Sequence, residues 1–275
     1  MIVITGSLVR LTGSGLGCEG WPGCEEGAFF PAADYHAFVE FGNRVVGIFP
    51  ITLSILTAWF ARRRRDWVFK LAVAVALLTL AEAPLGLATI RYDLPPEMVI
   101  FHFLVALLAL GGAVVIALEA YREERGAAAL EFPKELRWAG VVLLTACLAL
   151  VVSGTFSTAA GPHSGDPDVV DRLGHLPDAV YVHVRVTAVF GAFFLFVLGY
   201  LAQRRESAPG VWRAALLLLG VLLAQMVVGE IQYRLELPWG IVGVHVALAA
   251  AVWALTVALV TLLWRPPAWI TARQG

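Results

Sequence analysis

The stretch AEAPLGLATIRYDLPPEMVIFHFLVAL, residues 81–107, recurs in a related form as AQMVVGEIQYRLELPWGIVGVHVALAA, residues 224–250. At a constant offset of 143 residues, the matches include Gly86 with Gly229, Arg91 with Arg234, Leu94 with Leu237, Pro95 with Pro238, and His102 with His245. Glu82 falls opposite Gln225. A repeat of this length indicates that one structural unit occurs twice in the chain.

Earlier parts of the two copies also correspond. Each begins with two glycines that are seven residues apart: Gly6 with Gly13, and Gly154 with Gly161. We therefore expect a tandem repeat with an N-terminal half at 1–125 and a C-terminal half at 126–275, each of four helices. Because each half has an even number of helices, the two copies should share one orientation rather than being inverted.

The composition is that of a polytopic membrane protein. Of the 275 residues, 59% are hydrophobic and 15% are charged, and the mean hydropathy is +0.78, which excludes a soluble domain. No basic tract interleaved with aromatics points to nucleic acid. The glycine-rich opening lacks the Lys-Ser/Thr ending of a phosphate-binding loop.

Apolar runs of about 20 residues cross a bilayer as helices. The sequence predicts seven such runs: 35–61, 67–90, 97–121, 136–157, 178–203, 211–233 and 239–264. Residues 1–10 resemble the last turns of an eighth helix whose first part is missing. The predicted fold class is all-α, with eight transmembrane helices in two tandem four-helix bundles and the first helix truncated.

The distribution of positive charge predicts the orientation. One set of loops holds 14 of the 20 Lys and Arg residues, including the run Arg62 to Arg65. By the positive-inside rule this set faces the cytoplasm. We expect a multi-pass protein of the cytoplasmic membrane, with the C-terminus inside and the cysteine-containing loop outside.

Three histidines are predicted at matching depth in the membrane. His102, His183 and His245 each follow a helix start by a few residues, which places them about 8–11 Å below the outer helix ends. His183 and His245, within one half, could bind a haem iron from both faces. The alternative is that each imidazole hydrogen-bonds a neighbouring helix. Zinc is disfavoured, because no acid or thiol joins the histidines at that depth.

The first half lacks one of these two ligands. Asn43 stands opposite His183, so only His102 would bind iron strongly. An iron with both faces filled suits electron transfer, whereas an open face suits chemistry. This asymmetry indicates a cofactor half and a substrate half.

The stretch DYHAFVEFGNR, residues 34–44, is expected to begin a helix at the N-cap Asp34. His36, Glu40 and Arg44 follow at intervals of four and share one face. Glu40 is a candidate acid/base or proton carrier; the alternative is an interfacial ion pair with Arg44. Candidate contacts to haem propionates or to the substrate are His36, Asn43, Arg44, Arg91 and Arg234. Glu82 lies deep in a predicted span, and its role is left open.

Cys18 and Cys24 lie in the predicted outer loop, where an oxidising environment favours a disulfide. Such a bond could staple the loop, or the two thiols could take part in redox chemistry. Cys147 lies within a predicted helix and is interpreted as a packed, inert thiol.

These residues together resemble the haem A synthase family over nearly the whole chain. The most specific motifs are GSLVRLTGSGLGCEGWPGC at 6–24, EFGNR at 40–44, and the LP…H pattern that ends at His102 and recurs at His245. Asn43 stands where many members have a histidine, and Glu82 where many have glutamine. The resemblance implies oxidation of a haem O methyl group to the formyl group of haem A, which serves terminal oxidases.

The resemblance also implies roles for individual residues. His183 and His245 match the ligands of a haem b cofactor, His102 matches a ligand of the substrate haem, and Glu40 matches a catalytic glutamate. Cys18 and Cys24 match a disulfide-forming pair. Expected partners are haem O, membrane lipid, an electron acceptor, haem O synthase and oxidase assembly factors. The alternative function is a dihaem, cytochrome b-like electron carrier or quinol oxidoreductase that does not modify haem.

Overall fold

The computed structural model describes residues 2–25, 27–31, 33–170 and 172–271. Within these residues it contains eight α-helices, one short 3-10 helix and no strand. The helices are α1 (Ile2–Leu11), α2 (Tyr35–Ala61), α3 (Trp67–Arg91), α4 (Pro96–Arg125), α5 (Lys134–Ala160), α6 (Leu176–Ala202), α7 (Pro209–Arg234) and α8 (Trp239–Trp264), followed by the 3-10 helix η1 (Ala268–Ile270).

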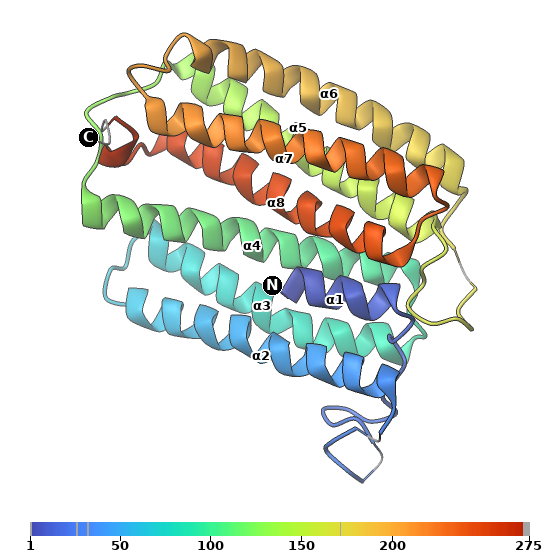
Figure 1. The fold of residues 1–275 in the computed structure, drawn as a ribbon. Helices are drawn as coiled ribbons and strands as arrows, with labels where there is room; N and C mark the ends of the chain where they lie inside the picture. Colours follow the sequence, from blue (N-terminus) through green and yellow to red (C-terminus); the bar gives the residue numbers. More distant parts are fainter. Residues whose placement is uncertain (1, 26, 32, 171, 272–275) are drawn as a thin grey trace.

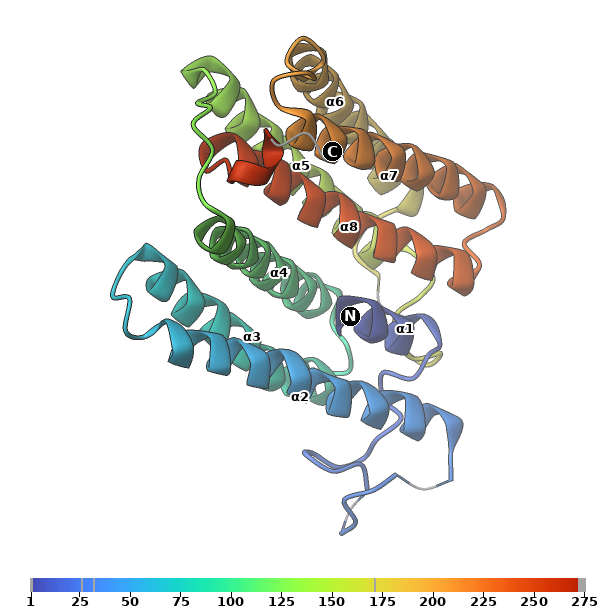
Figure 2. The same ribbon diagram turned by 60° about the vertical axis from the view of Figure 1, so that its left-hand side comes forward.

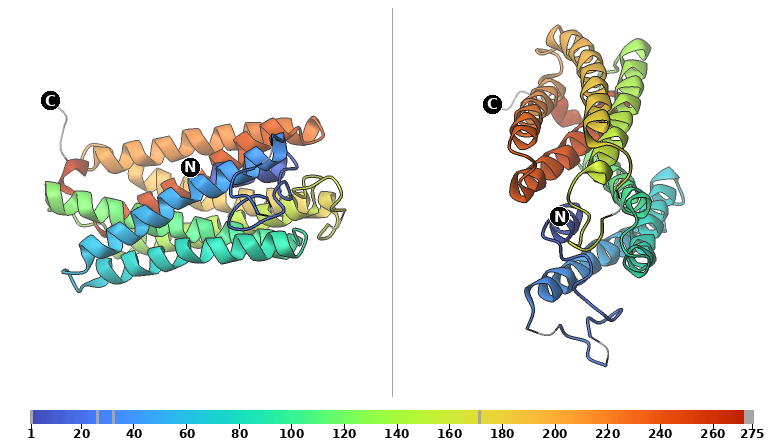
Figure 3. Two further views of the ribbon diagram at one scale, coloured as in Figure 1. Left: turned by 90° about the horizontal axis from the view of Figure 1, so that it is seen from below. Right: turned by 90° about the vertical axis from the view of Figure 1, so that its right-hand side faces the viewer.

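The helices lie side by side in two groups (Figures 1 and 2). In the first group α1 packs on α2, α2 on α3, α3 on α4, and α4 again on α1. In the second group α5, α6, α7 and α8 close a ring in the same order. A view along the helices shows the two groups one above the other (Figure 3, right). The arrangement agrees with two four-helix units, while the boundary at residue 125 stays a prediction.

Among the described residues, α2 to α8 are long and apolar enough to span a membrane, and α1 is a shorter apolar helix. Each predicted span agrees with its observed helix to within four residues at either end. The prediction of an all-helical, polytopic membrane protein is therefore confirmed. The Arg-rich α2–α3 connection lies at the opposite end of the bundle from the cysteine-containing loop (Figure 1).

Local chemistry accounts for several helix ends. The Asp34 side chain accepts a hydrogen bond from the Ala37 amide at 3.0 Å, so the predicted N-cap of α2 is confirmed. Asp66 caps α3 in the same way, through the amides of Val68 and Phe69. Prolines, which lack the amide hydrogen that a first turn leaves unpaired, begin α4 and α7.

The turns that follow α3 and α7 have the same backbone conformation. Asp93 and Leu94 have φ values of 58° and 58°, and Glu236 and Leu237 have 61° and 63°. Two consecutive left-handed residues other than glycine are uncommon. The Leu94 amide bonds Thr89 O, and the Leu237 amide bonds Gln232 O, both at 2.8 Å. This shared, unusual turn supports the tandem repeat inferred from the sequence.

Helix α8 joins the two groups because it packs against α1 and α4 as well as α5 and α7. Trp253 of α8 is 5% exposed, and its indole nitrogen donates to the Leu107 carbonyl of α4 at 2.7 Å. The same ring lies over Gly111, where an added Cβ would approach Trp253 to 3.2 Å. The glycine therefore lets the indole reach the α4 backbone.

An ionic cluster also links the groups at the end that carries the Arg-rich connection. Glu119 near the end of α4 is 2% exposed. Its two carboxylate oxygens accept from Arg265, just after α8, at 2.6 and 2.7 Å, and Arg122 donates at 3.2 Å. Because Glu119 and Arg265 belong to different groups, this pair spans the boundary between them.

Candidate functional site

In the second group, each predicted histidine ligand lies against a glycine of the neighbouring helix. A Cβ added at Gly154 of α5 would lie 3.1 Å from Cε1 of His183 on α6. At Gly229 of α7, the added Cβ would lie 3.0 Å from Cε1 of His245 on α8. Any larger residue at either glycine would displace the imidazole, so the glycines determine where the rings lie.

The first group repeats this arrangement. Gly86 of α3 lies against His102 of α4, and Gly6 of α1 lies against the Asn43 amide of α2, with added Cβ atoms at 3.7 and 3.9 Å. The four helix pairs thus place four matched side chains, three histidines and one asparagine, beside four matched glycines. The repeated glycines were already visible in the sequence, but their contact with the histidines was not predicted.

The hydrogen bonds around His183 define which ring nitrogen is free. Ser153 Oγ donates to the Leu150 carbonyl at 2.8 Å, so its proton is engaged and it accepts from His183 Nδ1 at 2.9 Å. The Nε2 atom then carries the lone pair, which is the form that binds a metal. Ser153 is a site residue that the sequence analysis missed.

His245 has a different environment. Its Nε2 lies 3.1 Å from the Gln225 amide nitrogen, and its Nδ1 is buried without a hydrogen-bond partner among the described residues. His183 on α6 and His245 on α8 belong to the same four-helix group.

In the first group, His102 Nδ1 lies 3.2 Å from Glu82 Oε2, without the alignment of a hydrogen bond. Glu82 Oε1 and Asn43 Oδ1 are buried and have no hydrogen-bond partner among the described residues. Unsatisfied buried polar atoms are costly in a native fold. Such atoms occur in both groups, since Nδ1 of His245 in the second group also has no partner among the described residues.

The donor set fits a haem better than a bare metal ion. Among the described residues, no three His, Cys, Asp or Glu side chains are grouped so that they could hold a metal. A porphyrin supplies four ligands of its own and needs only one or two axial imidazoles. Two histidines in the second group, and one in the first, match this requirement.

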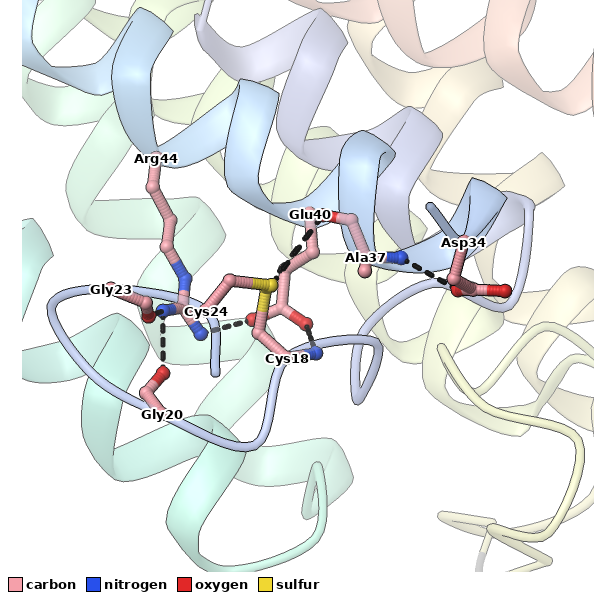
Figure 4. The surroundings of a disulfide bond; sticks show 8 residues. All are labelled: Cys18, Gly20, Gly23, Cys24, Asp34, Ala37, Glu40 and Arg44. Carbon is pink, nitrogen blue, oxygen red and sulfur yellow. Dashed lines mark hydrogen bonds and ion pairs between the residues drawn. A yellow bond between two sulfur atoms is a disulfide. The ribbon is translucent and has the colours of Figure 1, made fainter. Parts of the chain in front are cut away.

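Glu40 lies near the N-terminal end of α2, where the cysteine-containing loop folds back on the helix (Figure 4). It is 3% exposed. Its Oε2 accepts from the Cys18 amide at 2.9 Å, and its Oε1 accepts from Arg44 Nη2 at 2.5 Å. The ion pair weighed in the sequence analysis exists, but its carboxylate is buried rather than exposed at the interface.

Arg44 holds the same loop from its other guanidinium nitrogen. Its Nη1 donates to the carbonyls of Gly20 and Gly23 at 2.7 and 2.5 Å. Cys18 and Cys24 form the predicted disulfide, which is confirmed. Both sulfurs lie within 3.8 Å of the Ala37 carbonyl. Glu40, Arg44 and the disulfide thus form one unit that fixes the loop on α2.

The other predicted contacts lie outside the bundle interiors. His36 is exposed, and its Nδ1 lies 2.9 Å from Ser14 Oγ in the loop. Arg91 is also exposed. Arg234 is exposed and pairs with Glu230 at 2.5 Å. Nothing in these positions brings Arg91 or Arg234 next to a histidine.

Arg10 is a residue that the sequence analysis passed over. Its Nη1 donates to the His163 carbonyl at 2.9 Å, which ties α1 to the α5–α6 loop. The His163 ring in turn contacts the Leu237 carbonyl at 2.8 Å. A chain of contacts therefore crosses the end of the bundle that carries the cysteine-containing loop, from the first group to the α7–α8 turn. In the sequence, Arg10 could have been singled out because it lies within SLVRL, residues 7–11, a part of the motif at 6–24.

Comparison with known proteins identifies relatives along the whole chain. A family model described as "Cytochrome oxidase assembly protein" matches residues 1–257. A protein of Shewanella oneidensis named "Heme A synthase" is 25% identical over 313 residues, which cover 96% of this chain and 93% of that protein.

Two further relatives with the same name match over a shorter region. The one from Symbiobacterium thermophilum is 33% identical over 131 residues, covering 46% of this chain and 42% of the relative. The one from Bacillus licheniformis is 30% identical over 122 residues, covering 42% of this chain and 40% of the relative. In these two matches the chain spans less than half the length of the relative. Because the family model matches residues 1–257, which are most of this chain, the chain belongs to the cytochrome oxidase assembly protein family.

Proposed function

We propose that this protein is a haem A synthase, a membrane oxidoreductase that oxidises one methyl group of haem O to the formyl group of haem A. The observation that carries the proposal is the matched set of interior positions, with two histidines in one group and one histidine with an asparagine in the other. The family assignment and the names of the relatives support it.

In this proposal His183 and His245 of the second group would hold haem b as the resident cofactor. Ser153 keeps His183 in the tautomer whose Nε2 can bind iron. Gly154 and Gly229 leave room for the two rings beside the helix backbones. A haem held by these residues would supply electron-transfer chemistry.

The first group takes the substrate haem, with His102 as its ligand and Asn43 on the matched position. An asparagine amide is a weak iron ligand compared with imidazole. It leaves one side of the site accessible, as a reaction at the porphyrin edge requires. Protein groups nearby would orient the substrate and exclude water.

Glu40 is the proposed acid/base group. Its carboxylate is shielded from water, and it accepts hydrogen bonds from the Cys18 amide and from Arg44. Such a carboxylate can take up a proton at Oε2 if the loop moves away. The bond from Arg44 to Oε1 would keep the carboxylate in position during this step. The Cys18–Cys24 bond acts as a staple of this loop over the substrate half.

We further propose a cytoplasmic-membrane location, with the cysteine-containing loop outside and the C-terminus in the cytoplasm, based on the distribution of Lys and Arg. Haem O would arrive from a haem O synthase, and haem A would leave toward terminal oxidase assembly. The lipid bilayer and an electron acceptor complete the set of proposed partners.

The test is co-expression with a source of haem O, followed by pigment extraction and mass spectrometry. A haem A synthase yields haem A. A cytochrome b-like carrier or quinol oxidoreductase, which is the alternative, binds haem but yields only haem B and haem O. Absence of haem A from protein that has bound haem would therefore reject the enzyme in favour of the carrier.

A further inference from the structure

The cysteine-containing loop between α1 and α2 lies beside α2 rather than beyond its end, whereas the α5–α6 loop extends past the helix ends (Figure 3). The rings of Phe29 and Phe30 lie against Phe41 of α2, with centroids 5.6 and 6.1 Å away. Phe41 follows the N-cap Asp34 by seven residues, which is about 10 Å along the helix axis. The loop therefore returns along the side of a helix that is long and apolar enough to span a membrane.

The side of α2 on which the loop lies faces lipid. Phe41, Val45 and Ile48 follow one another at intervals of four and three residues, so they share one face of the helix. Val45 and Ile48 are exposed, and exposed apolar side chains on a spanning helix contact the acyl chains of the bilayer. Because Phe29 and Phe30 pack on Phe41, they continue this apolar stripe toward the N-terminal end of α2.

Three aromatic side chains of the loop are themselves exposed: Trp21 by 49%, Phe29 by 58% and Phe30 by 72%. Such a group is unfavourable in water, whereas the aromatic side chains of interfacial segments enter the boundary between headgroups and acyl chains by about 5–10 Å. Glu19 of the same loop is also exposed, and a carboxylate is far less costly among headgroups than in hydrocarbon. The composition therefore suits the headgroup boundary and not the bilayer centre.

Hydrogen bonds within the protein satisfy the backbone of this loop. Arg44 donates to the carbonyls of Gly20 and Gly23 at 2.7 and 2.5 Å. The Gly20 amide donates to the Cys24 carbonyl at 2.8 Å, and the Cys24 amide donates to the Phe29 carbonyl at 3.2 Å. A loop that enters a membrane needs such partners, because water is scarce there and an unpaired backbone group is costly.

We propose that Trp21, Phe29, Phe30 and Phe41 form an aromatic surface that binds the phospholipid bilayer at the boundary between headgroups and acyl chains. Lipid is the occupant because the aromatic surface continues the lipid-facing stripe of α2 and lies beside the second turn of that helix. The same loop covers Glu40, so the bilayer holds this cover against α2. This role needs no bound haem and goes beyond the proposed function.

The test uses the full chain in lipid nanodiscs, with tryptophan emission as the readout. The chain has nine tryptophans, so the emission of Trp21 is taken as the difference between the wild type and Trp21→Phe. In nanodiscs of phosphatidylcholine that carries bromine on its acyl chains, Trp21 should lose most of its emission. Iodide ions in the water should leave the Trp21 emission nearly unchanged.

Val170 provides the matched control, because it is 80% exposed in the α5–α6 loop at the same end of the bundle. The emission added by Val170→Trp should show the opposite pattern, with strong quenching by iodide and little by brominated lipid. If iodide quenches Trp21 as strongly as it quenches this control, the loop lies in water and the proposal is overturned. If neither quencher reaches Trp21, protein covers the aromatic surface, and the proposal is overturned as well.

A second reporter keeps the test decisive if Trp21→Phe does not fold. Phe30→Trp keeps an aromatic ring at the most exposed position of the aromatic surface. The emission that it adds to the wild type should be quenched by brominated lipid and spared by iodide. The reverse pattern would contradict the proposal.

Discussion

Glu40 and Arg44 form an ion pair on α2, and each of the two side chains also bonds the cysteine-containing loop. The carboxylate accepts the Cys18 amide, and the guanidinium donates to two loop carbonyls. With side-chain exposures of 4% for Glu40 and 16% for Arg44, the pair is largely shielded from solvent. Removing one partner of such a pair costs more than the pair contributes, because the other charge stays buried.

Glu40→Ala should block formation of the formyl group but leave the second-group haem bound, because Glu40 lies on α2 in the other half. The destabilisation should be about 1–3 kcal/mol, since Arg44 keeps its two carbonyl partners. Absorption spectra measure the bound haem, extracted pigments the product, and thermal unfolding the stability. A normal yield of haem A from the variant would remove Glu40 from the mechanism.

His183→Ala and His245→Ala should each abolish the spectrum of a low-spin, six-coordinate haem, because each removes one of two proposed axial ligands. The exposed loop histidine His175 provides the control, and His175→Ala should retain the spectrum. The measurement is the absorption spectrum of the purified, reduced protein. A retained low-spin spectrum in either ligand variant would place the haem elsewhere.

At the scale of the helix, glycines decide how closely a histidine approaches its neighbour. Three histidine contacts and one asparagine contact recur at matched positions of α1, α3, α5 and α7. Other glycines face open space; a Cβ added at Gly220 of α7 or Gly191 of α6 would meet nothing within 4 Å. The matched glycines are therefore distinguished by what they contact, not by a general need for flexibility.

Gly154→Ala should weaken haem binding, because the new Cβ would lie 3.1 Å from the His183 ring and push it away. Gly191→Ala, on the helix that carries His183, should keep haem binding and stabilise the protein by about 0.5–1 kcal/mol through helix propensity. Haem titration and thermal unfolding test both. Equal haem affinity in the two variants would contradict the role of the glycine contact.

The start of α3 shows how one element depends on pH. The hydrogen bond from Arg64 is the main cause that holds the pKa of Asp66 below its usual range, and the capped amides add to it. Arg64 also bonds Glu123 of α4, and this contact raises the pKa of Arg64. Because the Asp66 pKa is lower in the folded than in the unfolded state, its stabilising contribution is present at neutral pH.

We expect this contribution to be lost as the pH falls through and below the usual carboxyl range, where Asp66 becomes protonated. Asp66→Asn should therefore unfold with a weaker dependence on acid pH than the wild type. Thermal unfolding measured as a function of pH tests this. An unchanged acid dependence in the variant would show that the Asp66 cap does not contribute.

At the scale of the whole molecule, few polar contacts join the two groups. The Trp253 indole bonds α4 in the middle of the bundle, Glu119 binds Arg265 at one end, and Arg10 reaches the α5–α6 loop at the other. Each contact joins residues more than 140 positions apart. Their spacing along the bundle holds the two groups in one relative position.

Glu119→Gln should loosen the junction, because it removes the charge that binds Arg265 and Arg122 while both cations remain. We expect a loss of about 1–3 kcal/mol of unfolding free energy. Tryptophan fluorescence during thermal unfolding provides the measurement. Glu124→Gln, on the same helix but exposed, is the control and should behave as the wild type; equal loss in both variants would argue against the junction.

Much of this architecture follows from local patterns. Each apolar run is long enough to make helix formation in a bilayer obligatory, because an unpaired backbone amide is too costly there. Asp34 was recognisable as a cap because capping involves only the next three residues. The repeat was visible because both copies keep the residues of one turn, from Leu94 to Pro95 and from Leu237 to Pro238.

Contacts between helices were harder to predict from the sequence than the helices themselves. Ser153 carries no signal in the sequence, because a serine in a membrane helix usually bonds its own backbone. Only the packing of α5 against α6 reveals its second partner, His183. Likewise, Arg91 and Arg234 match in the repeat, yet the fold leaves both exposed. The direction in which a side chain points depends on neighbours that lie far away in the chain.

By itself, the sequence determined the number of the spanning helices, their bounds to within four residues, the tandem repeat and the disulfide partners. These depend on composition, spacing and identity along the chain. Only the tertiary structure decided that His102, His183 and His245 each lie against a glycine. It also decided that Glu82 rather than an arginine neighbours His102, and that Glu40 is buried beneath the loop. The physical reason is that these contacts join different helices. The sequence is compatible with many ways of packing the helices together, and only the packed structure shows which side chains meet.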